Sequence, residues 1–463
     1  MDGSEPRYRE RSLWLDGLAG TLTPRGSLGS EIDCDVAIVG AGFTGLWTAY
    51  YLASLQRDLR IVVIEREIAG FGASGRNGGW VSGFIAGDPA VYARRHSDDA
   101  VLRAERATFA AISEIGRVAA EERIDCGFLH AGSLSIAFSA PQLARLTASV
   151  TSKHRRGLGE GDLRLLDPGE LERLVRVPAP RGAAFSPHAA RIDPARLVRG
   201  LARACERLGV AIYERTAAAE IRPGAIVCPA GTVRAPMIVR ATESFTIEQP
   251  RESRRFLPLY SLMVATEPLP AGVWDELGWS GCETVSDAHH LFFYAQRTSD
   301  DRIAMGGRGA PYRLGSPIDA SHEHNDAVRS RLVAAIRKHF PAAAEAAITH
   351  HWGGPLAVPR DWSMGITIDR LRGMAFAGGY AGHGVVAANL SGRTLADLIL
   401  GRESELVGLP WVGHRSRAWE PEPLRFLASR AIVSVLGSAD RAEDATDRSA
   451  RRTRLVQPFV LGR

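Results

Sequence analysis

Residues 34–45, with the sequence CDVAIVGAGFTG, decide the fold of this chain. The run at 34–39 is short and apolar, which predicts a buried parallel strand. A helix is expected over about residues 43–55, and a second strand over 60–65. The segment therefore predicts a β-α-β unit whose crossover has the length of a parallel pair.

The glycines after the first strand match the pattern G-x-G-x-x-G. Gly40 permits the tight turn, Gly42 lets backbone approach a pyrophosphate, and Gly45 lets helix and strand pack closely. The helix N-terminus offers N–H groups to the phosphates. Glu65 lies 20 residues after Gly45, where a carboxylate would accept hydrogen bonds from ribose hydroxyls. Strand, helix and acid together favour a dinucleotide site over a glycine turn without a ligand.

Two more segments are rich in small residues, GASGRNGG at 72–79 and GGYAGHGV at 378–385. The first predicts a loop that passes against something flat or charged, with Arg76 and Asn77 as donors; a flexible surface loop is the alternative. The second lies between an apolar strand and a helix from about residue 388. Such a helix N-terminus can stabilise negative charge on a ring system, although alone the segment could be a structural turn.

Composition narrows the class of protein. The 463 residues allow two packed lobes, and 45% apolar with 24% charged residues is ordinary for a globular protein. The five cysteines are scattered without a C-x-x-C pair, which signals neither zinc nor disulfides and suits a cytoplasmic location. The net charge of +5 comes from arginines spread along the chain, so nucleic-acid binding is not expected. We expect no secretory signal, because residues 1–11 are charged and lack an apolar h-region. We expect no spanning helix, because no apolar run approaches ~20 residues, and membrane contact is not expected.

The order of these motifs resembles the D-amino-acid oxidase superfamily of FAD-dependent oxidoreductases. Within it, the chain is similar to the branch of gamma-glutamylputrescine oxidase and the glycine and sarcosine oxidases. The resemblance spans roughly residues 12–403 and is specific for fold and cofactor rather than for substrate. The matching segments are 35–45, 72–79, 266–269, 301–303 with 306–307, 352–354 and 379–384.

The resemblance implies an α/β fold in which a discontinuous Rossmann-like FAD-binding domain carries an inserted antiparallel-sheet substrate domain. The FAD-binding domain is expected at 30–95, 150–250 and 350–405, and the substrate domain at 96–149 and 251–349. Within the latter, strands at 291–295 and 302–306 are expected to form a hairpin. Residues 406–463 would form a C-terminal helical arm.

The resemblance also assigns the cofactor contacts. The first glycine motif would hold the pyrophosphate and Glu65 the adenosine ribose, while Ala218 would meet the adenine through its backbone. Residues 74–79 would contact the pyrophosphate and isoalloxazine, and 382–385 the pyrimidine edge of the flavin. The expected cofactor-binding residues are Gly40, Gly42, Phe43, Thr44, Gly45, Glu65, Arg66, Ser74, Gly75, Arg76, Asn77, Gly78, Gly79, Ala218, Gly382, His383, Gly384 and Val385.

The chain departs from its resembled relatives in three places. Val386 stands where the sarcosine oxidase branch has a lysine that helps bind the substrate carboxylate. No cysteine follows Cys282, so linkage of FAD to a late cysteine is excluded and non-covalent binding is expected. The only lysines, Lys153 and Lys338, lie outside the flavin motifs. Another cation would then promote reaction with molecular oxygen, or electrons would pass to another acceptor; family analogy favours an oxidase.

The expected reaction is FAD-dependent oxidation of an amine or amino acid. Hydride passes to the flavin, and the imine is hydrolysed to an aldehyde or oxo acid. The expected catalytic residues are His383, Tyr294, Arg297, Arg308 and Tyr260, with His289, His290 and Trp352 as further pocket candidates. Arginine would clamp a carboxylate and aromatic rings would favour an amine cation, although each residue could instead be structural. No metal site is expected, because neighbouring His350 and His351 lack a carboxylate.

Two other functions stay open. A flavin monooxygenase is one, although the third glycine segment lacks the Gly-Asp-Ala type of carboxylate usual there. A non-catalytic flavoprotein that acts through partner binding is the other. In the C-terminal arm, apolar residues recur at helical spacing from Leu424 to Leu436. This stripe predicts docking onto the body or onto a second subunit; an interfacial membrane helix is the alternative.

Overall fold

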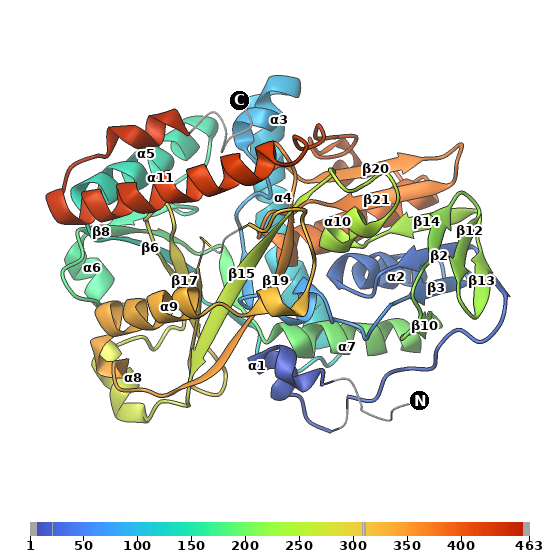
Figure 1. Ribbon diagram of the computed structural model, residues 1–463, viewed down its shortest axis with the longest axis horizontal. Helices are drawn as coiled ribbons and strands as arrows, with labels where there is room; N and C mark the ends of the chain where they lie inside the picture. Colours follow the sequence, from blue (N-terminus) through green and yellow to red (C-terminus); the bar gives the residue numbers. More distant parts are fainter. Residues whose placement is uncertain (1–6, 21, 308, 310–311, 457–463) are drawn as a thin grey trace.

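The computed structural model describes residues 7–456, except 21, 308, 310 and 311. Its two largest sheets have six and eight strands, with the orders β10-β3-β2-β14-β21-β20 and β19-β15-β18-β17-β16-β6-β8-β7. Figure 1 shows the six-stranded sheet on the right and the eight-stranded sheet on the left. This arrangement confirms the expected α/β fold with a second, largely antiparallel sheet.

The six-stranded sheet contains the predicted β-α-β unit. Its strands are β2 (Val36–Val39), β3 (Ile61–Ile64), β10 (Ala211–Tyr213), β14 (Met237–Arg240), β20 (Gly365–Asp369) and β21 (Met374–Gly378). All neighbours pair in parallel except β20 and β21. Every residue of β2 and β3 is buried, as both faces of a parallel sheet require. The strands come from three separate stretches of sequence, so this part of the chain is discontinuous.

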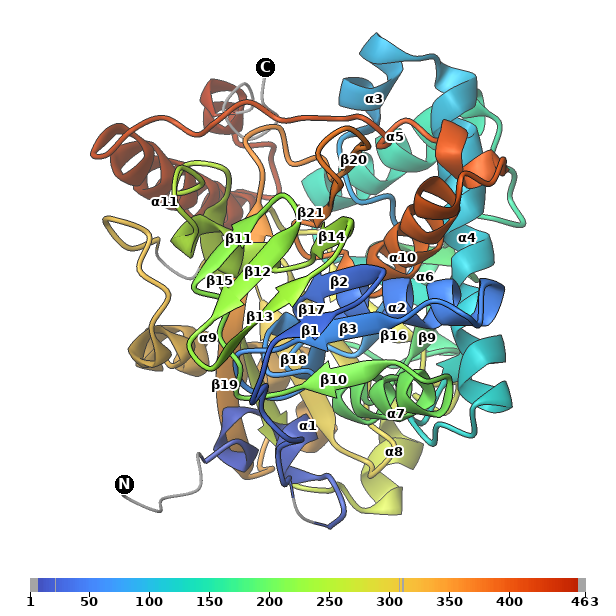
Figure 2. The same ribbon diagram turned by 90° about the vertical axis from the view of Figure 1, so that its right-hand side faces the viewer.

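Helices and a small sheet cover the two faces of this sheet. The helix α2 (Phe43–Leu55) packs against α7 (Pro194–Arg207) and α10 (Gly384–Leu400). Figure 2 shows these helices together, with the sheet of β11 (Glu220–Arg222), β12 (Ala225–Cys228) and β13 (Gly231–Arg234) on the other side. The buried glycines and alanines of α2 and α10 let the two helices approach closely beside the first glycine turn.

The eight-stranded sheet forms the second layer. Its strands are β6 (Ser133–Ala137), β7 (Arg164–Leu166), β8 (Gly182–Ser186), β15 (Leu257–Thr266), β16 (Thr284–Asp287), β17 (Phe293–Arg297), β18 (Ile303–Gly307) and β19 (Ile348–Val358). All pairs are antiparallel except β16 with β6, and the expected hairpin is β17 with β18. The helix α9 (Asp326–His339) packs on β15 and β18. It ends at His339, shortly before Pro341.

The residue blocks expected for the two domains differ from the sheets. Strands β7 and β8 lie within 150–250, and most of β19 lies within 350–405, yet all three join the eight-stranded sheet. The short strands β7 and β8 carry too few residues to show periodicity, and they reach this sheet only by pairing with each other and with β6. We therefore propose a domain division that follows the two sheets.

Three further helices enclose the space beside the eight-stranded sheet. They are α4 (Asp98–Glu121), α5 (Ala140–Arg156) and α11 (Leu424–Thr446). The Ser97 side chain caps α4 by accepting from the Ala100 N–H, and Gly157 ends α5 in a left-handed conformation. In Figure 1, α11 runs across α5 at the upper left. Among the described helices, none combines the length and hydropathy that crossing a bilayer requires.

Candidate functional site

A large cavity, with a volume of about 1230 Å³, lies at the carboxyl ends of β2, β3 and β14. Open α/β sheets bind ligands in this crevice. Its wall includes residues from all three glycine-rich segments, and also from β15 and β17 of the second sheet. The cavity therefore has one side that belongs to each sheet.

The first glycine segment turns tightly into α2. Gly40 has φ +108°, and a Cβ there would lie 2.5 Å from the Ala241 carbonyl oxygen. A Cβ on Gly45 would overlap the Gly40 carbonyl oxygen. One backbone N–H group of this turn binds the predicted carboxylate: Ala41 donates to Glu65 Oε2 at 2.8 Å. Burial raises the pKa of Glu65, so additional donors such as ribose hydroxyls would stabilise its charge.

The second segment is braced and is not a flexible surface loop. The Asn77 side chain donates to the carbonyls of Ala73 and Ser74, both at 3.1 Å. The buried Arg76 forms a 2.7 Å ion pair with Glu323. Its carbonyl accepts from the Trp352 indole at 2.9 Å, which gives Trp352 a structural contact outside the cavity wall. The loop is therefore held in place before any ligand arrives.

The third segment is tied to the first. The Tyr380 and Thr44 hydroxyls lie 2.8 Å apart, and α10 begins at Gly384. Glu243 accepts from the backbone N–H groups of Gly379 at 3.0 Å and Tyr380 at 3.4 Å. Burial raises the pKa of Glu243 to about 7. The sequence gives no sign of this carboxylate, because it reaches the loop only through the pairing of β14 with β21.

Most of the expected cofactor-binding residues line this cavity. They are Gly40, Gly42, Phe43, Thr44, Glu65, Arg66, Ser74, Arg76, Asn77, Gly78, Ala218, Gly382, His383, Gly384 and Val385. Gly45, Gly75 and Gly79 are not in the wall, and at each of them a Cβ would overlap other protein atoms. A Cβ on Gly75 would overlap the Gly70 carbonyl oxygen, and one on Gly79 would overlap the Gln296 amide. These three glycines shape the loops behind the surface that faces a ligand.

Aromatic side chains wall the part of the cavity beside the second sheet. Tyr294 lies against Gly78 and Gly306, where a Cβ on Gly306 would overlap its ring. Its hydroxyl lies 2.7 Å from the Ser261 hydroxyl. Tyr260 also lines the cavity and donates to the Asp319 carbonyl at 3.2 Å. The structure thus brings both expected catalytic tyrosines to one part of the cavity, which we call the aromatic chamber (Tyr260, Tyr294 and Phe84).

The other expected catalytic residues divide between the cavity and elsewhere. His383 lines the cavity, and its ring centre lies 6.0 Å from that of Phe84. Arg297 is absent from the wall, because Asp301 binds its guanidinium at 2.6 Å. The expectation that Arg297 clamps substrate is therefore not supported by its position. Arg308 lies outside the described residues.

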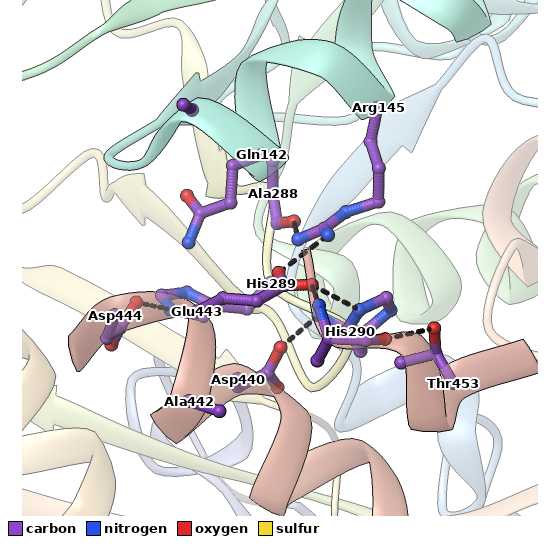
Figure 3. A network of polar contacts seen from close by, with 12 residues as sticks. Gln142, Arg145, Ala288, His289, His290, Asp440, Ala442, Glu443, Asp444 and Thr453 are labelled. Carbon is purple, nitrogen blue, oxygen red and sulfur yellow. Dashed lines mark hydrogen bonds and ion pairs between the residues drawn. The ribbon is translucent and has the colours of Figure 1, made fainter. Parts of the chain in front are cut away.

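A polar network attaches α11 to α5 and to the segment 288–291 (Figure 3). Asp440 accepts from the backbone N–H groups of His290 at 2.9 Å and Leu291 at 3.0 Å, and Glu443 pairs with Arg145 at 2.7 Å. Three of these side chains lie close enough together to hold a metal ion: His290, Asp440 and Glu443. Because the two carboxylates already accept protein hydrogen bonds, we interpret the cluster as an attachment of α11.

His289 forms the outer part of this attachment. It bridges Asp287 and Asp444, the latter at 2.8 Å, and does not line the cavity, whereas His290 does. On its inner side, α11 closes the chamber with Leu424, Ala428, Ser429, Ile432, Val433 and Leu436. The predicted docking of the apolar stripe onto the body is therefore seen for part of the stripe, and both Leu424, at the edge of the cavity, and Leu427 stay exposed.

Comparison with known proteins identifies the family. Residues 35–398 match the model of the family described as FAD dependent oxidoreductase (DAO). The chain belongs to this family. It is 29% identical to the gamma-glutamylputrescine oxidoreductase of Escherichia coli over 84% of this chain and 89% of that protein. It is 30% identical to the probable oxidoreductase OrdL of Rhizobium meliloti over 80% of this chain and 84% of that protein.

Solved structures of this DAO family share the fold. Glycine oxidase from Geobacillus kaustophilus superposes with a TM-score of 0.69 at 21% identity, covering 84% of this chain and all of that one. L-proline dehydrogenase from P. horikoshii gives a TM-score of 0.66 at 18% identity, covering 83% of this chain and 96% of that one. At these identities the likeness concerns the fold alone.

The residues of the DAO-family site fit FAD. The two glycines at the start of α2 leave backbone exposed at the cavity, and a Cβ on Gly42 would narrow the space to 3.0 Å from the Ser74 hydroxyl oxygen. The α2 N-terminus would hold the pyrophosphate and Glu65 the ribose. When bound, FAD supplies an isoalloxazine ring that accepts a hydride. The chain is an FAD-dependent oxidoreductase of this family.

Proposed function

We propose that the protein oxidises the C–N bond of a small amine or amino acid. A hydride and its electron pair leave the carbon next to nitrogen for FAD, and the resulting imine reacts with water to give an aldehyde or oxo acid and the released amine. The observation that carries this proposal is the aromatic chamber of Tyr260, Tyr294 and Phe84, which opens directly onto the glycine-lined wall in one cavity.

The chamber suits an amine for electrostatic reasons. Aromatic rings attract ammonium groups through their π faces. His383 lines the same cavity, and we propose that it takes a proton from the ammonium. The neutral amine then has the lone pair that assists loss of hydride. The relatives include a gamma-glutamylputrescine oxidoreductase and a glycine oxidase, whose names both refer to compounds with a C–N bond.

We further propose that molecular oxygen takes the electrons from the reduced cofactor, giving hydrogen peroxide. The cofactor would be held without a covalent bond, since all five cysteines are buried and none lies in the cavity wall. Assembly into homo-oligomers through α11 is a further part of this proposal. Its outward side carries the exposed Leu427, whereas its inner side closes the chamber.

Anaerobic titration of the purified yellow protein with amines, amino acids and polyamines tests the main proposal. We expect at least one primary or secondary amine to bleach the flavin absorbance, and tetramethylammonium, which has no lone pair, to leave it unchanged. Admission of air should then restore the colour and form one peroxide per flavin if oxygen is the acceptor.

Different results would favour the other functions. Bleaching by a nicotinamide cofactor, and by no amine, would indicate a monooxygenase. Absence of bleaching with every compound, together with a stable complex with another protein, would indicate a non-catalytic flavoprotein.

A further inference from the structure

One end of the cavity is formed by the helices α4 and α5, and it carries two charged groups. Glu105 from α4, and Ser149 and Lys153 from α5, line the wall there. Lys153 Nζ lies 5.0 Å from the centre of the Phe84 ring. Phe84 in turn neighbours His383 of the third glycine segment, with 6.0 Å between the ring centres, so Lys153 and His383 share one aromatic neighbour.

Lys153 differs from the arginines of the cavity wall because, among the described residues, it has no carboxylate within ion-pair distance. Those arginines are paired with carboxylates: Arg66 with Glu248, Arg76 with Glu323, Arg360 with Glu420 and Arg425 with Glu422. Within the described part of the chain, no carboxylate oxygen lies within 4.0 Å of Lys153 Nζ. Its ammonium group instead makes a cation–π contact with the Phe84 ring. A cation at the cavity surface is therefore available to a ligand.

Glu105 does not neutralise this cation. Its side chain is only 2% exposed, and its Oε1 accepts from Arg156 at 3.0 Å. Its Oε2 has no hydrogen-bond partner among the described residues. One carboxylate between two cations leaves a single positive charge at this end of the cavity. The local charge suits a monoanion, and the free oxygen suits a neighbouring N–H donor.

Burial of Lys153 makes a bound anion more important for keeping its ammonium group charged. Removal from water lowers the pKa of Lys153, and the nearby Glu105 only partly opposes this effect. A bound carboxylate would stabilise the ammonium form, because charge-assisted hydrogen bonds are strong where water is excluded. A doubly charged phosphate would bring one negative charge too many against Glu105.

We propose that Lys153 binds a carboxylate at the end of the substrate remote from the oxidised C–N bond, with Glu105 Oε2 accepting from an adjacent N–H. This inference rests on the proposed amine oxidation. It makes the substrate an amino carboxylate whose two charged groups are separated by several bonds, since Lys153 Nζ lies 5.0 Å and the His383 ring centre 6.0 Å from the centre of the Phe84 ring. An α-amino acid as short as glycine would not reach both ends.

The test compares amines of matched length with and without the carboxylate. For the wild-type holoenzyme, kcat/KM is measured with glycine, γ-aminobutyrate, δ-aminovalerate, ε-aminocaproate and the corresponding alkylamines. We expect the longer amino carboxylates to exceed their alkylamines by about 10- to 100-fold, the range of a hydrogen bond to a charged group. Lys153→Met should bring this ratio of kcat/KM values close to 1, mainly by raising KM for the amino carboxylates. The kcat/KM values for the alkylamines should stay unchanged.

Two variants and a binding measurement serve as controls. Lys338→Met removes the other lysine, which is 60% exposed and absent from the cavity wall, and should keep the wild-type ratio. Lys153→Arg should retain most of the preference for amino carboxylates. This conservative variant keeps the proposal testable even if Lys153→Met does not fold. Binding of caproate, which has no amine to oxidise, should perturb the flavin absorbance of the wild type at concentrations at least about 10-fold below those needed for Lys153→Met.

The outcomes separate this inference from the proposed function. Oxidation of alkylamines with no preference for any amino carboxylate would overturn the role of Lys153 while leaving amine oxidation intact. A wild-type ratio that persists in Lys153→Met would do the same. Lys153-dependent binding of caproate in a protein that no amine reduces would keep the carboxylate site and remove the proposed reaction.

Discussion

The Ser74 hydroxyl accepts a hydrogen bond from the Phe43 backbone N–H at 2.8 Å. The second glycine-rich segment is thereby fixed to the first turn of α2, whose N-cap, Gly42, has no side chain to do this. One of the otherwise unpaired N–H groups of the helix is satisfied, and both segments keep their place at the cavity.

Substitution of Ser74 by alanine should weaken FAD binding. Loss of this cap costs about 1 kcal/mol, which corresponds to a roughly five-fold lower affinity if the loop loosens in the apoprotein. Quenching of flavin fluorescence during reconstitution of the apoprotein measures the change. The exposed Ser30→Ala serves as control, and an unchanged dissociation constant for Ser74→Ala would show that the bond does not organise the site.

Substitution of Glu65 by glutamine should also lower the affinity for FAD, and by more. The neutral amide keeps one acceptor for the backbone N–H groups of Ala41 and Glu67 but loses the charge that ribose hydroxyls would stabilise. Hydrogen bonds to charged groups contribute about 1.5–3 kcal/mol, so a 10- to 100-fold loss is expected by the same titration. Glu31→Gln, which breaks an exposed ion pair with Arg234, should bind like wild type.

A methyl group on Gly306 should impair substrate oxidation without removing FAD. The Cβ of Gly306→Ala would overlap the Tyr294 ring, which Gly78 confines on another side, so the ring must move within the chamber. Overpacking of this kind costs about 1–3 kcal/mol. We expect slower anaerobic bleaching by amines at wild-type FAD content. Gly408→Ala, where a Cβ meets no atom within 4 Å, is the matched control.

The attachment of α11 should weaken in alkaline solution. Burial lowers the pKa of His289, but its hydrogen bonds with Asp287 and Asp444 outweigh this effect and raise the pKa to about 10. Because an unfolded histidine titrates near 6.5, the stabilisation is complete below that pH and is lost as the pH rises through about 10. Limited proteolysis of α11 should therefore accelerate over this alkaline range.

His289→Gln supplies the comparison for the pH series. This variant should be cleaved faster than wild type at neutral pH and should lose the part of the pH dependence that His289 causes. His130→Gln, at an exposed position, should behave like wild type. Equal cleavage of wild type and His289→Gln at every pH would contradict the role of this histidine in holding α11.

The local sequence predicts the cofactor side of the molecule well because steric rules act over a few residues. Gly40 and Gly45 are required by a turn whose close contacts lie within five residues of each other or on the adjacent strand. The hairpin of β17 and β18 is likewise signalled by its turn at residues 299–301. Strands β7 and β8 give no such signal, because their place depends on pairing with β6.

The substrate side depends on contacts between distant stretches of chain. Lys153 looks like one cation in a polar helical end, and only the packing of α5 beside α4 brings it to the cavity with Glu105. Arg297 has the right residue type for a carboxylate clamp, but Asp301, four residues later, already binds it. Charge and residue type therefore do not reveal which cations are free, since the pairing partners come from the tertiary fold.

The cavity wall combines the region shared by the family with one helix that lies beyond it. The glycine turns that face the cofactor lie within residues 35–398, which the family shares, whereas the helix that closes the chamber begins at Leu424. Substitutions along that one helix can therefore change which substrate is oxidised while the cofactor site stays the same. Related chains can diverge in substrate specificity and still inherit every contact to the nucleotide.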